Sequence, residues 1–290
     1  MLMIVVGFGF KVAAVPFHLW APDAYQGAPT PSAAFIASGS KVASFFILAK
    51  VMTVGFAGAE GSGAWRGFAQ GWVPILALLA ALSVVVGNLA AIAQSSVKRL
   101  LAYSAIAHAG YALVGVLANQ KTDGLAAVLY YVATYALTTV GAFAVVAVVQ
   151  EQTGDDKLTA FAGLSRRSPL LACCLMIFLL SLAGIPPLAG FFGKFYLFKA
   201  GLFLKGGGTA SLGLLWLVIL ALAMSAVSLY YSLQVLKQAF VADAPPDAPS
   251  LPVSTVTSVT LVLLAGSVLL LGVFPSLLLN TLLAALSVAQ

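Results

Sequence analysis

Long apolar segments, each about long enough for a helix to cross a bilayer, make up most of this chain. A membrane-spanning helix requires about 20 predominantly apolar residues, and eight such segments lie between short polar turns such as Ala21-Pro22-Asp23. They cover about residues 1–20, 32–57, 72–95, 99–119, 124–150, 169–204, 211–240 and 255–288. None alternates in the manner of a membrane β-barrel strand. We therefore predict an all-α fold, a polytopic transmembrane helical bundle.

The composition excludes several classes of soluble protein. Of the 290 residues, 62% are hydrophobic and 8% are charged, whereas a soluble domain carries about 25% charged residues. The net charge of +6 comes from scattered cations with no run longer than two. A soluble enzyme, a nucleic-acid-binding module and a disordered chain are therefore excluded, and the expected surroundings are the lipid bilayer.

Three lysines lie inside apolar segments, namely Lys11, Lys41 and Lys194. A charge at the bilayer centre costs at least ~2.5–3.5 kcal/mol, although a lysine near a helix end can extend its amine to the interface. Lys41 is about ten residues from either end of its segment and is too deep for that alternative. We interpret all three as candidate proton-transfer groups.

Two of these lysines accompany helix-breaking residues. Pro16 follows Lys11 by five residues, and a second group of breakers precedes Lys194: Gly184, Pro186, Pro187, Gly190 and Gly193. Unwound backbone at membrane depth is tolerated only inside protein or along a wet cavity. Paired broken helices are typical of transporter cores built on inverted repeats, and an ordinary proline kink is the alternative.

Polar side chains repeat at helical spacing in three segments. The stripes are Ser104, His108 and Tyr111; Tyr131, Tyr135 and Thr138; and Ser225, Ser228 and Ser232. Such groups either support a chain of water molecules or join helices through hydrogen bonds, and both interpretations stay open. His108 adds an imidazole, whose ordinary pKa near 6.5 suits a proton relay, so it is a fourth candidate proton-transfer residue.

The chain has few acidic residues, and they lie away from the middle of the apolar segments. All eight carboxylates fall in turns or at helix ends: Asp23, Glu60, Asp123, Glu151, Asp155, Asp156, Asp243 and Asp247. An acidic partner for the membrane lysines is therefore expected from sequence outside this chain or from another subunit.

No motif fits a dinucleotide, haem, metal or iron–sulfur cluster, so we expect no cofactor-binding residue, no metal ligand and no redox chemistry here.

Three blocks carry a resemblance to a known family: Gly9–Pro31, Val97–Tyr111 and Gly184–Tyr196. They closely resemble subunit N of bacterial NADH-quinone oxidoreductase (complex I), the counterpart of mitochondrial NADH dehydrogenase subunit 2. The Tyr25-Gln26-Gly27-Ala28-Pro29 stretch is more similar to subunit N than to its antiporter-like paralogues L and M.

The resemblance implies an antiporter-like fold, of which this chain matches the C-terminal part, helices 7–14 of fourteen. The inverted repeat is then incomplete at the N-terminus. Residues 1–57 are the remainder of the first repeat, with two helices. Residues 58–240 form the second repeat of five helices, one of them broken at about 169–204, and residues 241–290 are a C-terminal helix.

The resemblance also implies a function. The chain is expected to be a subunit of a translocase, contributing a proton path through Lys11, Lys41 and Lys194. NADH, FMN, iron–sulfur clusters and quinone would lie in other subunits, and the location would be a bacterial cell inner membrane, with other membrane subunits of complex I as partners. The family's glutamate partner of the first lysine has no counterpart here. A cation/proton antiporter subunit of the same superfamily and a truncated, non-conducting scaffold remain as alternatives.

Overall fold

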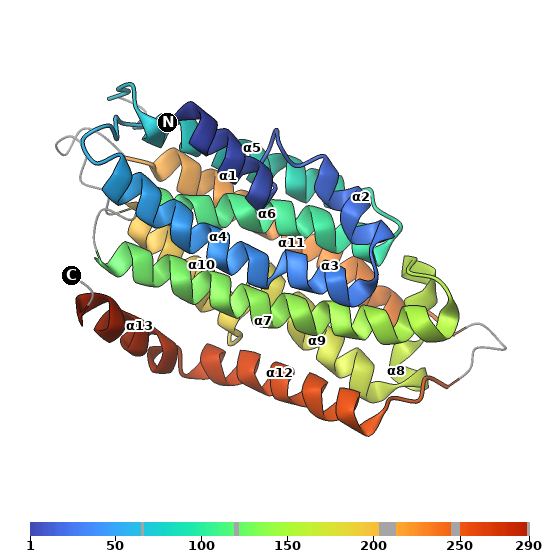
Figure 1. Cartoon of the computed structure of the whole chain (residues 1–290). Helices are drawn as coiled ribbons and strands as arrows, with labels where there is room; N and C mark the ends of the chain where they lie inside the picture. The colour runs from blue at the N-terminus through green and yellow to red at the C-terminus, as the bar shows by residue number, and fades with distance from the viewer. Residues whose placement is uncertain (65–66, 119–121, 203–212, 245–249, 289–290) are drawn as a thin grey trace.

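The described part of the molecule is built of helices that lie side by side in one bundle (Figure 1). The computed structural model describes residues 1–64, 67–118, 122–202, 213–244 and 250–288. Its helices are α1 (Leu2–Val12), α2 (Trp20–Gly27), α3 (Thr30–Ala37), α4 (Gly39–Lys50), α5 (Trp72–Ile92), α6 (Val97–Leu117), α7 (Thr122–Thr153), α8 (Leu164–Arg167), α9 (Pro169–Ala183), α10 (Ala189–Leu202), α11 (Leu215–Phe240), α12 (Thr255–Val273) and α13 (Ser276–Val288).

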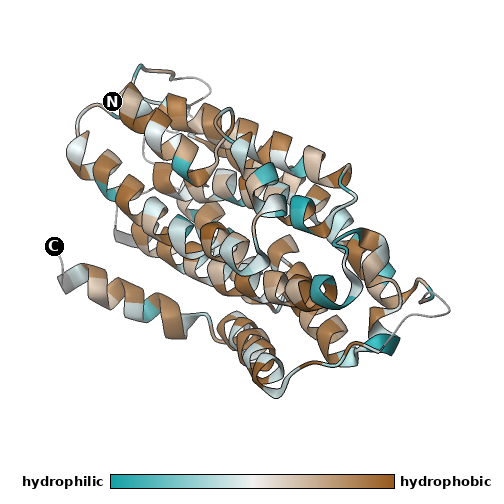
Figure 2. Ribbon diagram, turned by 45° about the vertical axis from the view of Figure 1, so that its right-hand side comes forward, coloured by the Kyte–Doolittle hydropathy of each residue, from teal (hydrophilic) through white to brown (hydrophobic). Residues whose placement is uncertain are grey.

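Membrane insertion is supported by the length and hydropathy of these helices. Within the described ranges, six stretches are long and apolar enough to cross a bilayer: Thr30–Gly55, Trp72–Ile92, Val97–Leu117, Gly124–Thr153, Leu215–Phe240 and Thr255–Val273. Figure 2 shows apolar residues over most of the ribbon. The prediction of an all-α membrane bundle is confirmed.

Helix α6 forms the centre of the bundle. It contacts α2, α4, α5, α7, α10 and α11, and each of its residues is buried except Arg99 and Tyr103. A helix surrounded on all sides must be apolar or must satisfy its polar groups internally. The polar side chains of α6 therefore face other helices, and the candidate site is organised around them.

The backbones of helices α5 and α6 approach each other closely, because two positions at their interface are glycine. A Cβ atom on Gly87 would lie 2.5 Å from the amide nitrogen of Ala107, and one on Gly110 would lie 2.8 Å from the carbonyl oxygen of Ala80. Real Cβ atoms do not approach backbone that closely. These two glycines bring the polar groups of α5 within reach of those of α6.

The chain breaks its helices at both places where prolines and glycines occur together. Helix α1 ends at Val12, and α2 begins only at Trp20. Later, α9 ends at Ala183 and α10 begins at Ala189. Each break leaves backbone groups without helical partners, and these must be satisfied by other elements.

Two local expectations from the sequence were wrong. Ala21-Pro22-Asp23 is part of α2 and not an exposed turn, and Ala21 and Pro22 are buried. Proline is tolerated in the first turn of a helix, and α2 packs against α6. The segment 255–288 forms two helices, α12 and α13. A proline disfavours the α conformation of the residue before it, and Phe274, which precedes Pro275, ends α12.

The stretch around Lys41 is also less regular than expected. Helices α3 and α4 meet at Ser38, whose φ of −116° and ψ of −84° depart from helical values, and a π-helical stretch, Val51–Gly55, continues α4. The proposed division into 1–57, 58–240 and 241–290 stays a prediction.

Candidate functional site

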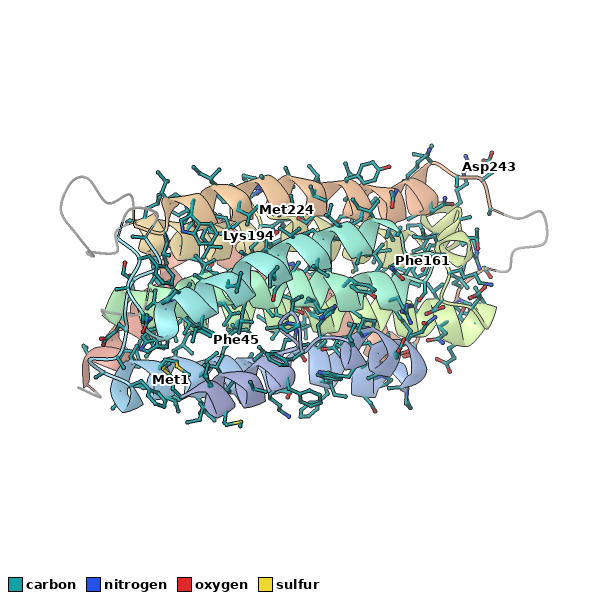
Figure 3. All side chains as sticks on the ribbon, turned by 90° about the horizontal axis from the view of Figure 1, so that it is seen from above. Met1, Phe45, Phe161, Lys194, Met224 and Asp243 are labelled. Carbon is teal, nitrogen blue, oxygen red and sulfur yellow. The ribbon has the colours of Figure 1, made fainter. Side chains whose placement is uncertain are left out.

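Lys194 is buried at the break between α9 and α10. Its Nζ donates to the carbonyl oxygen of Ala183 at 2.9 Å and to Ser225 Oγ of α11 at 2.8 Å. Ala183 is the last residue of α9, so its carbonyl is one of those that the helix end leaves free. Figure 3 shows Lys194 within the length of the bundle, whereas Asp243 lies at one end. The break thus supplies a backbone acceptor for an amine inside the membrane-spanning part of the fold.

Glycines make this break possible. Gly184 has a φ of +90°, and a Cβ there would also lie 3.1 Å from Lys194 Cδ. A Cβ on Gly190 would overlap the carbonyl oxygen of Ser181. The amide of Gly190 instead donates to Ser181 Oγ at 3.1 Å. The turn therefore needs glycine for its backbone angle at one position and for close approach at the other.

Lys41 is the second buried lysine, and it approaches α6 from α4. Only 3% of the residue is exposed, and its Nζ donates to the carbonyl oxygen of Ala105 at 2.5 Å. That carbonyl lies inside α6, where each backbone oxygen retains a second lone pair for an additional donor. The same amine lies 6.0 Å from the centre of the Tyr135 ring.

His108 lies on α6 between the positions that the two lysines contact. Its Nδ1 is 2.6 Å from the hydroxyl oxygen of Tyr131, and its ring centre is 4.8 Å from that of Tyr135 and 5.6 Å from that of Tyr111. Lys194 Nζ in turn lies 4.9 Å from the centre of the Tyr111 ring. Tyrosine rings therefore connect both amines with the imidazole. We call Lys41, His108, Lys194 and the tyrosines 111, 131 and 135 the central axis.

Several buried polar atoms have no hydrogen-bond partner among the described residues, and two of them, His108 Nε2 and Tyr135 Oη, belong to the central axis. The others are Thr139 Oγ1, Tyr25 Oη and His18 Nδ1. Buried polar groups nearly always form a hydrogen bond, to protein or to ordered water. We therefore expect internal water molecules beside His108 and Tyr135.

Carbonyls, hydroxyls and aromatic rings surround the two buried amines. Among the side chains whose burial the structure describes, no aspartate or glutamate is buried. In the same part of the chain, no three His, Cys, Asp or Glu residues lie close enough together to hold a metal ion. An unpaired ammonium is stabilised here only by dipoles and by the electron-rich faces of rings.

The structure places Lys11 away from the central axis. It lies in the last turn of α1, and its side chain is exposed, in contrast to the burial expected from the sequence. Two side chains bind backbone groups at the break that follows: Ser83 Oγ of α5 accepts from the amide of Val15 at 2.9 Å, and the Trp20 indole donates to the carbonyl oxygen of Phe10 at 3.0 Å. The helix break at Pro16 is present, but it does not bring Lys11 to the other lysines.

Two buried polar residues do not emerge from the sequence patterns. A lysine beside an arginine at a helix start predicts a charge at the membrane surface, yet only 2% of Lys98 is exposed and its Nζ donates to the carbonyl oxygen of Ala28 at 2.9 Å. Asn88 of α5 is fully buried and bonds Tyr111 and Tyr231. For Asn88, the sequence does offer a signal, a single amide inside an apolar segment. For Lys98 it offers none, because the burial depends on contact with α2.

The bundle of membrane-spanning helices holds two buried lysines, Lys41 and Lys194, and the second lies at a helix break, an arrangement typical of transporter cores. Residues 1–222 match the family model described as "NADH:quinone oxidoreductase/Mrp antiporter, TM". The chain belongs to this family.

Named relatives and solved structures agree with this assignment. NADH-quinone oxidoreductase subunit N 2 of Acidobacterium capsulatum is 57% identical over 96% of this chain and 55% of its own length. Subunit N of Desulforamulus reducens is 45% identical over 94% of this chain and 53% of its own. The chain therefore spans about half the length of the curated relatives that it matches.

Two structural neighbours describe the fold. A chain of respiratory complex I from Thermus thermophilus with bound aureothin superposes with a TM-score of 0.78 and is 39% identical, covering 97% of this chain and 58% of that chain. A chain of the Mrp complex from Dietzia sp. DQ12-45-1b has a TM-score of 0.84 at 20% identity, covering 99% and 58% respectively. At 20% identity, the similarity to the Mrp chain shows a shared fold and nothing more.

Proposed function

We propose that this chain forms part of a proton-conducting membrane subunit of NADH-quinone oxidoreductase in a bacterial cell inner membrane. The observation that carries the proposal is the central axis: two buried lysines from separate helices lie on either side of a buried histidine, and tyrosine rings connect all three. Intramembrane ionisable residues are costly and mark ion or proton pathways.

The partners of the amines suit reversible protonation. A lysine paired with a carboxylate is held in its charged form, because each charge stabilises the other. The Lys41 and Lys194 amines instead meet carbonyl oxygens, a hydroxyl and ring faces. These groups accept hydrogen bonds from the charged and the neutral amine alike. A proton that reaches one lysine can therefore pass to the other through His108, Tyr131 and internal water.

The other residues singled out in the sequence would support this path. The residues of the second break (Gly184, Pro186, Pro187, Gly190 and Gly193) would shape the pocket of Lys194, and Pro16 would end the helix that carries Lys11. Lys11 would exchange protons with groups outside the described bundle, because its side chain is exposed. NADH, FMN, iron–sulfur clusters and quinone would belong to other subunits of the complex, which would drive the proton movement by electron transfer.

A cation/proton antiporter subunit is the second candidate, because the fold is shared with the Mrp complex. Subunit N is favoured by identity: the two subunit N relatives are 57% and 45% identical to this chain, against 20% for the Mrp chain. The scaffold alternative predicts that the central axis has no role in transport, and the following experiment separates it from a conducting subunit.

The test replaces Lys194 with methionine in the assembled membrane complex and compares it with Lys199→Met. Both lysines belong to α10, but Lys194 is buried and Lys199 is exposed. Methionine keeps most of the volume, and Ser225 Oγ, which lies 3.3 Å from the carbonyl oxygen of Ala183, can still donate to that acceptor. We expect Lys194→Met to assemble and to lose NADH-driven acidification of inverted vesicles, while Lys199→Met retains it.

Equal acidification by the two variants would contradict the proposal and favour the scaffold alternative. Acidification that requires a sodium gradient, and continues without NADH, would favour the antiporter. Assembly is checked in both variants by the amount of complex recovered from the membrane.

A further inference from the structure

A second hydrogen-bonded connection runs beside His108 along the same part of α6. Tyr111 Oη accepts from Asn88 Nδ2 at 3.0 Å, Asn88 Oδ1 is 3.2 Å from Tyr231 Oη, and Tyr231 Oη is 3.3 Å from Ser104 Oγ. All four side chains are buried. The connection thus joins two residues of α6, Tyr111 and Ser104, through one residue of α5 and one of α11.

This connection covers the same interval as the central axis. Ser104 is the neighbour in sequence of Ala105, whose carbonyl binds Lys41, and the Tyr111 ring faces Lys194. Tyr111 lies seven positions after Ser104 on α6, a rise of about 10.5 Å, and His108 lies between them. A proton that moved along the second connection would pass from the surroundings of one lysine to those of the other without using His108.

The orientation of the Asn88 amide is fixed by the backbone. Its Nδ2 is 2.7 Å from the carbonyl oxygen of Val84, and a carbonyl only accepts, so the nitrogen must occupy that side. Oδ1 then faces Tyr231 and has no hydrogen of its own, so Tyr231 must donate to it. Ser104, which has a hydroxyl hydrogen, can supply the remaining bond to Tyr231.

An amide in this position cannot pass a proton along. A hydroxyl accepts a proton and releases another from the same oxygen, whereas an amide donates only from nitrogen and accepts only at oxygen. The two roles cannot be exchanged while Val84 holds the nitrogen in place. Asn88 therefore connects Tyr111 with Tyr231 mechanically but interrupts proton transfer between them.

We propose that Asn88 is a positioning residue that holds the Tyr111 ring against Lys194 and closes the Tyr111–Tyr231–Ser104 connection to protons, so that transfer between the lysines must pass through His108. This inference rests on the proposed function of the central axis. It assigns a role to Asn88 that follows from the chemistry of its amide and not from its contribution to packing.

The experiment asks whether a proton-relaying group at position 88 bypasses His108. His108→Leu should lower the protons pumped per NADH oxidised by the assembled complex. Asn88→Asp keeps the shape of the side chain, but a carboxyl group can take a proton on one oxygen and release it from the other. We expect the double variant His108→Leu/Asn88→Asp to recover part of the lost pumping.

Two further variants distinguish relay from altered packing. His108→Leu/Asn88→Leu has a similar shape but no relay group, so it should not recover pumping. Adding Tyr231→Phe to the recovering double variant removes only a hydroxyl and should abolish the recovery. Absence of recovery in an assembled His108→Leu/Asn88→Asp complex, or equal recovery with leucine at 88, would overturn the role of Asn88.

Failure of the proposed function gives a different pattern. Wild-type pumping by both Lys41→Ala and Lys194→Met would show that the central axis does not conduct. If those two variants lose pumping while His108→Leu retains it, the lysines conduct by another route and the inference about Asn88 is wrong.

Discussion

We expect Gly110→Ala to lower the stability of the fold, because Gly110 lies where α5 and α6 are in close contact. Replacing Gly110 with alanine adds a Cβ atom that would lie 2.6 Å from Val84 Cγ2 and 2.8 Å from both the Ala80 carbonyl oxygen and the Val84 amide nitrogen. Carbon atoms in favourable contact are about 3.5–4.0 Å apart. Because two of the three atoms belong to the backbone, the clash cannot be relieved by a side-chain rotation, and the helices must separate.

Two opposing effects set the magnitude. Forcing an extra methyl group into a packed interface costs about 1–3 kcal/mol. Alanine gains roughly 0.5–1 kcal/mol over glycine inside a helix. The clash thus outweighs the helical gain over most of this range, and we expect Gly110→Ala to lower stability by up to about 2.5 kcal/mol, the largest cost less the smallest gain.

The assay is thermal unfolding of the purified protein in detergent, followed by circular dichroism. Gly266→Ala is the matched control, because Gly266 lies inside α12 and a Cβ there has no atom within 4 Å. It receives the helical gain without the clash, so its unfolding temperature should equal or exceed that of the wild type. An unfolding temperature for Gly110→Ala at or above that of Gly266→Ala would refute the close-approach reasoning.

Two further predictions concern the end of the bundle and the second helix break. Asp23→Asn removes the ion pair with Arg99 at 2.5 Å, but 76% of the aspartate side chain is exposed, so we expect a loss below about 1 kcal/mol and no change in membrane insertion, measured by thermal unfolding and by membrane recovery. Gly190→Ala places a Cβ against the Ser181 carbonyl and should lower recovery of folded protein sharply. Gly27→Ala, with open space around its Cβ, should not; equal recovery of the two glycine variants would contradict this account of the break.

Much of the architecture could be predicted because it follows from local properties of the sequence. Apolar length alone indicates the membrane helices, and the group Gly184-Ile185-Pro186-Pro187 combines the two residue types that most disfavour a helix interior. The stripe of Ser104, His108 and Tyr111 was also readable, because helical spacing puts all three on one face.

Other features depend on which helices become neighbours, and these could not be read from spacing. The burial of Lys98 involves the contact between α2 and α6, in which its Nζ donates to the carbonyl oxygen of Ala28, the residue after α2. Lys11 is exposed because α1 lies at the surface of the described bundle. Its predicted burial came from the apolar residues around it in sequence, which cannot tell an outer face from an inner one.

Asn88 represents an intermediate case. A single amide within an apolar segment is a visible signal, yet its partners, Tyr111 and Tyr231, are 23 and 143 residues away in sequence. The signal indicates a polar interaction but does not identify the partner. Gly87 and Gly110 allow α5 and α6 to approach closely, and this approach brings the Asn88 amide to Tyr111 of α6.

The central claim is that Lys41 holds a proton in transit, and the most direct measurement is the number of protons pumped per NADH oxidised by sealed, inverted vesicles that contain Lys41→Ala. Lys50→Ala is the control, because Lys50 lies at the end of the same helix and is not buried. The account predicts that Lys41→Ala inserts and assembles but loses pumping, while Lys50→Ala pumps normally. Wild-type pumping by an assembled Lys41→Ala complex would contradict it.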